Sequence, residues 1–184
     1  LDLTNYPQLY DWSIDNIPEF WKAWWDFSAI IHSHSPQEIV DDVAKMPGAE
    51  WFSGAQLNFA ENLLRFRDDR IAICFKGEGQ PLRKMTYAEL YSEVARLADA
   101  LRKAGVEKGD RVAGFMPNMP EAVIAMLAAA SIGAVWSSSS PDFGIKGVLD
   151  RFTQIEPKIL FSANGYFYNG KPFDSLEKLN SILK

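Results

Sequence analysis

The order of apolar and polar positions over residues 70–184 alternates between strand-like and helix-like patterns. Short runs rich in β-branched and apolar residues occupy 70–76, 111–116, 134–137 and 158–162. Stretches with apolar residues at helical spacing separate most of these runs. This alternation predicts an α/β fold with a mostly parallel sheet and helices on both of its faces. The turn sequence at 77–79 also predicts that residues 82–85 return as a hairpin partner of the first run.

Capping signals predict where the helices begin and end. Thr86 and Glu89 have the spacing of a capping box, in which each side chain binds a free backbone amide of the other residue. Asn118 and Pro120 predict the start of the next helix, and Gly133 predicts its end. That helix carries almost no charge after its first turn, so we expect it to be buried between layers.

The first 66 residues have a different character, because they hold all of the tryptophans except Trp136. Asn16 and Pro18 predict a helix start. A second helix is predicted after Ser35-Pro36, and a third short helix around Phe59. We therefore expect a helical N-terminal extension over residues 1–66 and an incomplete first α/β subdomain over residues 67–184.

Composition narrows the possible classes of protein. The 184 residues carry a net charge of −5 and no basic block, so binding to nucleic acid or to an anionic membrane is not expected. The apolar run 122–136 is too short to cross a bilayer. Cys74 is the only cysteine, which fits the cytoplasm, and its strand-like surroundings predict a buried, inert thiol. No signal peptide is expected, and because the sequence lacks an initiator Met, we expect that a segment of unknown length has been removed upstream.

Two polar segments are candidate sites. Ser137–Ser140 and the following Pro-Asp-Phe-Gly come after a buried strand, where α/β sheets place ligand-binding loops. We favour this interpretation over a flexible linker, which would split a compact unit. The aromatic segment Gly165–Lys171 is either an exposed turn or an anion site, with Lys171 as the cation and Tyr166 or Tyr168 available for stacking.

Other kinds of site find no support. His32 and His34 lack accompanying ligands at suitable spacing, so no metal site is expected. The sequence contains no Gly-x-x-x-x-Gly-Lys-Ser/Thr, Gly-x-Gly-x-x-Gly or Gly-x-Ser-x-Gly motif. From the residues alone, the chain is an α/β domain without an assigned catalytic group.

The order of several longer motifs resembles a known family. These motifs are Leu-Asn-Phe-Ala-Glu-Asn at 57–62, Met-Thr-Tyr-Ala-Glu-Leu at 85–90, Lys-Gly-Asp-Arg-Val at 108–112 and Leu-Ala-Ala-Ala-Ser-Ile-Gly-Ala at 127–134. Together they resemble the N-terminal part of an acyl-CoA synthetase of the adenylate-forming superfamily, in its acetyl-CoA synthetase-like branch. Acetyl- and propionyl-CoA synthetases typically carry His in place of Trp136. The Trp136 and Ser-Ser-Ser-Ser-Pro-Asp-Phe-Gly combination is similar to the subgroup that activates acetoacetate.

The resemblance implies a ligase reaction for the complete protein. Acetoacetate and ATP would form an acyl-adenylate, which CoA would convert to a thioester, with Mg²⁺ as the expected metal. The family's Ser/Thr/Gly-rich phosphate loop is missing from this sequence, as is its C-terminal domain. We therefore expect no catalytic residue in this chain, no tightly bound cofactor, and dependence on the remainder of its own polypeptide. We expect the surface that this remainder normally covers to allow self-association.

The resemblance also assigns expected CoA-binding positions. They are Ser140, Pro141, Asp142, Phe143, Tyr168 and Lys171. Lys171 keeps the family's cation, whereas Tyr168 replaces the usual Arg. Two alternatives remain: a ligase for another short acyl or keto acid, and a non-catalytic α/β binding module.

Overall fold

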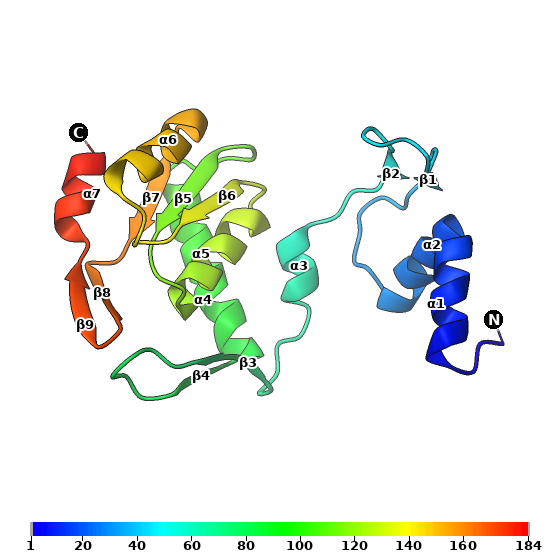
Figure 1. Ribbon diagram of the computed structural model, residues 1–184, viewed down its shortest axis with the longest axis horizontal. Helices are drawn as coiled ribbons and strands as arrows, with labels where there is room; N and C mark the ends of the chain where they lie inside the picture. The colour runs from blue at the N-terminus through cyan, green and yellow to red at the C-terminus, as the bar shows by residue number, and fades with distance from the viewer. Residues whose placement is uncertain (1, 184) are drawn as a thin grey trace. The chain divides into compact units, whose positions relative to one another are not determined.

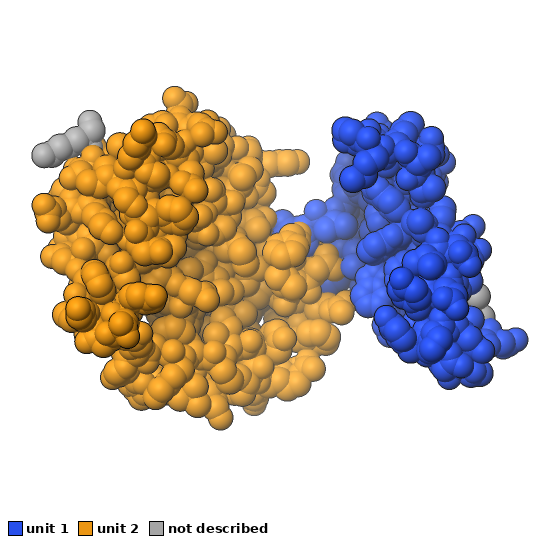
Figure 2. All heavy atoms as spheres, in the orientation of Figure 1, with its two compact units in different colours: residues 1–58 blue, residues 59–184 orange. Residues whose placement is uncertain are grey.

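The computed structural model describes residues 2–183. These residues form two compact units, which divide between Asn58 and Phe59 (Figure 2). Within the described range, no helix is long and apolar enough to cross a membrane.

The first unit is held together mainly by aromatic side chains. It consists of helices α1 (Tyr6–Asp15) and α2 (Ile17–Ser28) and the antiparallel strands β1 (Glu38–Val40) and β2 (Trp51–Ser53). Among residues 2–58, only Val40 belongs to the set of buried apolar side chains.

Ring contacts connect α2 to β2. The Trp25 ring stacks on Phe52 with centroids 5.1 Å apart, and Trp21 meets Trp51 edge-on at 6.1 Å. Such ring pairs prefer a particular geometry, and they add stabilisation to that from the apolar area they bury. The tryptophan-rich composition therefore serves to pack a small unit that lacks a large aliphatic core.

The predicted helix after Ser35-Pro36 is wrong. Residues Glu38–Val40 instead form β1, with Glu38 opposite Ser53 and Val40 opposite Trp51. β-branched Ile39 and Val40 fit a strand as well as a helix, and pairing with a distant segment decides between the two. Helix α1 was not predicted; its Asn5 cap, which accepts a hydrogen bond from the Gln8 amide at 3.0 Å, was the available signal.

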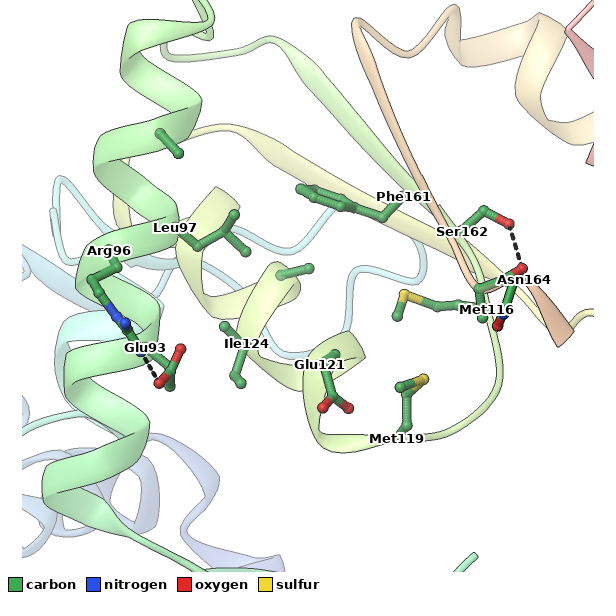
Figure 3. A pocket seen from close by; sticks show the side chains of 13 residues that line it. Glu93, Arg96, Leu97, Met116, Met119, Glu121, Ile124, Phe161, Ser162 and Asn164 are labelled. Carbon is green, nitrogen blue, oxygen red and sulfur yellow. Dashed lines mark hydrogen bonds and ion pairs between the residues drawn. The ribbon is translucent and has the colours of Figure 1, made fainter. Parts of the chain in front are cut away.

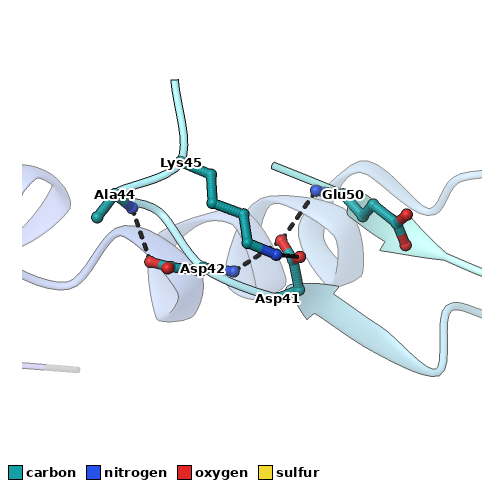
Figure 4. A network of polar contacts seen from close by, with 5 residues as sticks. All are labelled: Asp41, Asp42, Ala44, Lys45 and Glu50. Atoms are coloured by element: carbon teal, nitrogen blue, oxygen red, sulfur yellow. Dashed lines mark hydrogen bonds and ion pairs between the residues drawn. The ribbon is translucent and has the colours of Figure 1, made fainter. Parts of the chain in front are cut away.

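The loop after β1 is closed by a carboxylate network around Asp41 (Figure 4). Asp41 Oδ1 accepts hydrogen bonds from the amides of Asp42 at 2.7 Å and Glu50 at 2.9 Å, while Lys45 pairs with its other oxygen. The Lys45 ammonium and then the Glu50 amide lower the pKa of Asp41 to about 2. The network favours the ionised carboxylate in the folded unit.

We predict a pH dependence of stability from this group. Because the folded-state pKa is depressed, the stabilisation is present above the unfolded-state pKa of about 4. It is lost as the pH falls from there towards 2. Tryptophan fluorescence gives the urea concentration at the midpoint of unfolding, and we expect this midpoint to fall between about pH 4 and pH 2. Asp41→Asn is expected to show a smaller fall than the parent protein. The same fall in both proteins would contradict the prediction.

The second unit contains a central parallel sheet, with strand order β6 (Val135–Ser139), β5 (Arg111–Phe115), β7 (Ile159–Ser162). The remaining elements are α3 (Phe59–Leu63), β3 (Ile71–Phe75), β4 (Arg83–Thr86), α4 (Tyr87–Lys103), α5 (Pro120–Ser131), α6 (Ile145–Ile155), β8 (Gly165–Tyr168), β9 (Lys171–Asp174) and α7 (Leu176–Ile182). β3 pairs with β4 and β8 with β9, both antiparallel. The predicted α/β class with a parallel sheet is confirmed.

Helices cover both faces of this sheet, as the sequence predicts (Figure 1). Val112 of β5 belongs to a core shared with α4 and α5. The next residue, Ala113, points the other way, and with Phe115 it packs against Val148 and Phe152 of α6. Successive strand residues face opposite sides, so one strand anchors two cores.

Helix boundaries follow the sequence signals in part. The capping box is present: the Glu89 amide donates to the Thr86 hydroxyl at 3.1 Å, and the Thr86 amide donates to the Glu89 carboxylate at 2.7 Å. Helix α5 begins at Pro120, but Met119 occupies the cap position and supplies no side-chain hydrogen bond. The predicted start at Pro120 is confirmed, whereas the predicted capping role of Asn118 is wrong by one position.

The predicted burial of Cys74 is wrong. It lies in β3 opposite Lys84, and its side chain is exposed. The neighbouring Ile73 packs against the core, and alternation along a strand turns the next side chain outward.

Gly114 in β5 makes room for the Trp136 ring. A Cβ at this position would lie 2.7 Å from the Cζ2 and Cη2 atoms of Trp136. The indole also lies 6.3 Å from the Phe161 ring, so it spans the sheet beneath the helices. A side chain at Gly114 would displace this ring.

We predict that Gly114→Ala lowers stability by about 1–3 kcal/mol, the usual cost of overpacking a core. Thermal unfolding measures the effect. Gly147→Ala is the control, since a Cβ there meets its nearest neighbours at 3.5 Å and adds helix propensity in α6. A Gly114→Ala variant as stable as this control would contradict the account.

Candidate functional site

The serine segment is mostly strand. Ser137, Ser138 and Ser139 belong to β6 and pair with Ala113, Gly114 and Phe115 of β5. The predicted strand ends at Ser137, and the prediction of a loop is wrong for Ser138 and Ser139, because pairing with the buried strand overrides their turn preference. The loop between β6 and α6 comprises only Ser140–Gly144.

This short loop stands where the chain changes sides of the sheet. The connection after β5 runs through α5 on one face, and the connection after β6 runs through α6 on the other. Ligands of open α/β sheets bind in crevices at such points, outside the carboxyl ends of the strands. The position of the loop thus fits a ligand-binding role.

Hydrogen bonds shape the loop into a turn. The Phe143 amide donates to the Ser140 carbonyl at 3.2 Å. Pro141 is buried beneath the turn, while Ser140, Asp142 and Phe143 are exposed. Three of the four predicted residues in this segment are therefore accessible to a ligand.

Two cations that the sequence analysis did not identify support the turn. The Arg151 guanidinium carbon lies 4.4 Å from the centroid of the Phe143 ring, and its Nη1 donates to the Gly147 carbonyl at 2.6 Å. Lys178 Nζ donates to the Pro141 carbonyl at 3.1 Å. Arg151 lies four positions after Gly147, so helical spacing could have predicted that contact. The Lys178 contact joins residues 37 positions apart and has no such local signal.

The aromatic segment at 165–171 forms a hairpin with a tight turn. Asn169 and Gly170 have φ values of +50° and +73°, and Tyr168 lies directly opposite Lys171. Positive φ at both central residues is typical of the type I′ turn, for which Asn-Gly is a strong sequence signal. The structure therefore brings two predicted site residues together as cross-strand neighbours.

The face of this hairpin that carries Tyr168 and Lys171 also carries two stacked rings. Tyr166 lies opposite Phe173, with ring centroids 5.3 Å apart and planes 15° from parallel. Side chains two positions apart share a face, so Tyr168 and Lys171 adjoin this pair. An aromatic and cationic surface results.

The turn and the hairpin lie beyond the same edge of the sheet. Ser140 follows β6, and Gly165 comes shortly after β7, while both strands run parallel to β5 between them. Ordinary strand spacing puts the ends of β6 and β7 roughly 10 Å apart. The Lys178–Pro141 hydrogen bond links the turn to α7, which directly follows the hairpin.

A separate cavity of about 700 Å³ lies between the α4 and α5 layer and the end of β7 (Figure 3). Its lining is mainly apolar, including Leu97, Ile124 and Phe161. Glu121 contributes a carboxylate whose Oε1 accepts a hydrogen bond from Arg83 at 3.0 Å. Two further charged side chains of the lining, Glu93 and Arg96, pair with each other.

Sequence profiles of known families cover nearly the whole chain. Residues 6–63 match the profile described as the acetyl-coenzyme A synthetase N-terminus. Residues 59–183 match the profile described as AMP-binding enzyme. The chain belongs to the AMP-binding enzyme family.

Individual members of the family are similar over the full length of this chain. Acetoacetyl-CoA synthetase of Macaca fascicularis is 52% identical over 100% of the chain and 28% of its own length. Malonamoyl-CoA synthetase of Penicillium aethiopicum is 41% identical over 98% of the chain and 26% of its own length. The solved structure of acetoacetyl-CoA synthetase from Streptomyces lividans superposes with a TM-score of 0.91 at 43% identity, covering 99% of this chain and 28% of that one. The chain thus spans little more than a quarter of these relatives.

The end of β6 supplies a test of the site's construction. Ser139 is 5% exposed, and its hydroxyl has no hydrogen-bond partner among residues 2–183. An unpaired buried hydroxyl costs stability, so Ser139→Ala is expected to be neutral or to stabilise the chain by up to about 1 kcal/mol in thermal unfolding. A loss of stability would show that the hydroxyl has a partner.

Proposed function

We propose that this chain is the N-terminal part of an ATP-dependent acetoacetate–CoA ligase and contributes a CoA-binding surface to it. The proposed surface combines the turn at 140–143 with Tyr168 and Lys171. The observation that carries the proposal is the position of both segments beyond the carboxyl ends of β6 and β7, in a member of the AMP-binding enzyme family. Several relatives named acetoacetyl-CoA synthetase, each 52% identical over the whole chain, support the choice of substrate.

The proposed reaction has two steps. Acetoacetate first attacks the α-phosphate of ATP and forms acetoacetyl-adenylate, with release of diphosphate. The CoA thiol then attacks the acyl carbon, giving acetoacetyl-CoA and AMP. The chain's own groups would act in the second step by binding CoA, with no role for them in bond making.

The residues of the surface suit a nucleotide-bearing thiol. Lys171 offers an ammonium group for a phosphate, and the adjoining Tyr168 offers a hydroxyl donor and a ring. Phe143, 39% exposed and backed by Arg151, provides a second ring at the turn. A purine can stack on such a ring.

The proposed chemistry of adenylation lies outside this chain. A phosphate loop of the Ser/Thr/Gly-rich type is missing from the sequence. Within residues 2–183, no group of three or more His, Cys, Asp or Glu side chains could hold a metal ion. We therefore assign the Mg²⁺ expected for such a ligase to no residue of this chain.

A second candidate function is a ligase for another short acyl or keto acid. The 41% identity to a malonamoyl-CoA synthetase favours it, since that name gives a different acid. Comparing acetoacetate with malonamate and acetate as substrates of the full-length enzyme separates the two. Failure to activate any acid would instead support a non-catalytic binding module.

The proposal extends to the organisation of the protein. We propose residues 1–66 as the branch-specific extension and 67–184 as an incomplete first subdomain, working in the cytoplasm with the rest of the polypeptide. The single cysteine supports a reducing compartment. Exposed Phe27 and Phe167 are examples of apolar surface that supports self-association when the rest of the polypeptide is missing.

We predict that Lys171→Ala in the full-length ligase raises KM for CoA about tenfold, equivalent to roughly 1.4 kcal/mol. Acetoacetate-dependent ATP–pyrophosphate exchange is expected to be unchanged, because adenylation precedes CoA binding. Lys84→Ala, which removes an exposed lysine from β4, is the matched control. An unchanged KM for CoA in Lys171→Ala would contradict the proposed role.

A further inference from the structure

A carboxylate from a distant turn binds the tip of the hairpin. Glu78, between β3 and β4, accepts hydrogen bonds from the Asn169 amide to Oε1 at 3.0 Å and from the Gly170 amide to Oε2 at 2.8 Å. The residues joined are 91 and 92 positions apart in the sequence. Each oxygen takes one donor, so the two bonds fix both the position and the orientation of the turn.

Within residues 2–183, the hairpin does not belong to a larger sheet. β8 and β9 form a two-stranded sheet that joins no third strand in the described part of the chain. A two-stranded hairpin alone is only marginally stable in water. The central amides of a type I′ turn also point away from the ladder, so without Glu78 they would face solvent.

The base of the contact is itself well defined. The Gln80 amide donates to the Gly77 carbonyl at 3.2 Å and closes the turn that carries Glu78. β3 and β4 on either side are paired from Ile71 to Phe75, and Ile73 packs in the main core. The carboxylate is therefore presented from an ordered hairpin.

The bound amides lie between the two residues proposed to contact CoA. Asn169 and Gly170 are the only residues between Tyr168 and Lys171. We propose that Glu78 is a positioning residue for the CoA surface, holding the hairpin tip so that Tyr168 and Lys171 present their side chains together. This inference rests on the proposed function of the surface.

A positioning role and a purely electrostatic role of Glu78 predict opposite effects of its removal on KM for CoA. A carboxylate near a polyanionic ligand repels it, so removing that charge would lower KM for CoA if repulsion were the main effect. If Glu78 positions the hairpin, its removal raises KM for CoA. The sign of the change therefore distinguishes the two.

The experiment compares Glu78→Ala and Glu78→Gln in the full-length ligase. We expect Glu78→Ala to raise KM for CoA about tenfold, the change that roughly 1.4 kcal/mol of lost positioning produces. Glu78→Gln keeps one acceptor oxygen and is expected to show a smaller rise. KM for ATP and the rate of ATP–pyrophosphate exchange are expected to stay unchanged.

Hydrogen–deuterium exchange supplies a readout independent of activity. The amides at 168–171 are expected to exchange faster in Glu78→Ala than in the parent enzyme. Glu93→Gln is the matched control, because it also removes one carboxylate from a surface pair, here with Arg96 on α4. This control is expected to change neither exchange at the hairpin nor KM for CoA.

Each contrary outcome has a distinct meaning. A lower or unchanged KM for CoA in Glu78→Ala overturns the inference when Lys171→Ala raises that constant. If Glu78→Ala raises KM for ATP as much as KM for CoA and also lowers thermal stability, the inference is overturned in favour of a purely structural role. If Lys171→Ala has no effect while Glu78→Ala still speeds exchange, the proposed CoA surface is wrong, although the contact itself is real.

Discussion

The second unit depends on the burial of β5 between two neighbouring strands and two helical layers. Val112, Ala113 and Phe115 are fully buried, and they contribute to cores on opposite faces of the sheet. The lack of a side chain at Gly114 leaves the space that the Trp136 ring occupies over the sheet. An error in the register of β5 would exchange the two sets of buried side chains, so its pairing is tightly specified.

This constraint also determines where a ligand can approach. With both faces covered, a ligand is expected to approach at the carboxyl ends of the strands, and the two candidate segments follow strands that end there. The turn at 140–143 is supported by Arg151 and Lys178, and the hairpin by Glu78. In each segment, exposed side chains stand on backbone that is held by contacts with other elements. Such support is what a binding surface needs to keep its geometry.

Local signals in the sequence predict much of this fold. The alternation of strands and helices, the Thr86–Glu89 capping box and the β3–β4 hairpin depend on residues close in sequence, and all three are present. Predictions failed where distant pairing decides the outcome. Ser138 and Ser139 become strand because they pair with β5, and Glu38–Val40 become strand because they pair with β2.

For the candidate site too, the sequence predicts the features with local signals and not the contacts between distant residues. The resemblance to acyl-CoA synthetases indicates the turn and Lys171, and the Asn169-Gly170 dipeptide is a local signal for the hairpin. The contacts of Glu78 and Lys178 span 91 and 37 positions and have no local signature, so they required the three-dimensional structure.

The most direct test is a structure of the full-length protein with bound CoA. The account predicts that Lys171 Nζ lies within hydrogen-bond distance of a CoA phosphate oxygen, with the turn at 140–143 against the nucleotide. A CoA molecule bound elsewhere, with its phosphates far from both segments, would contradict the central claim.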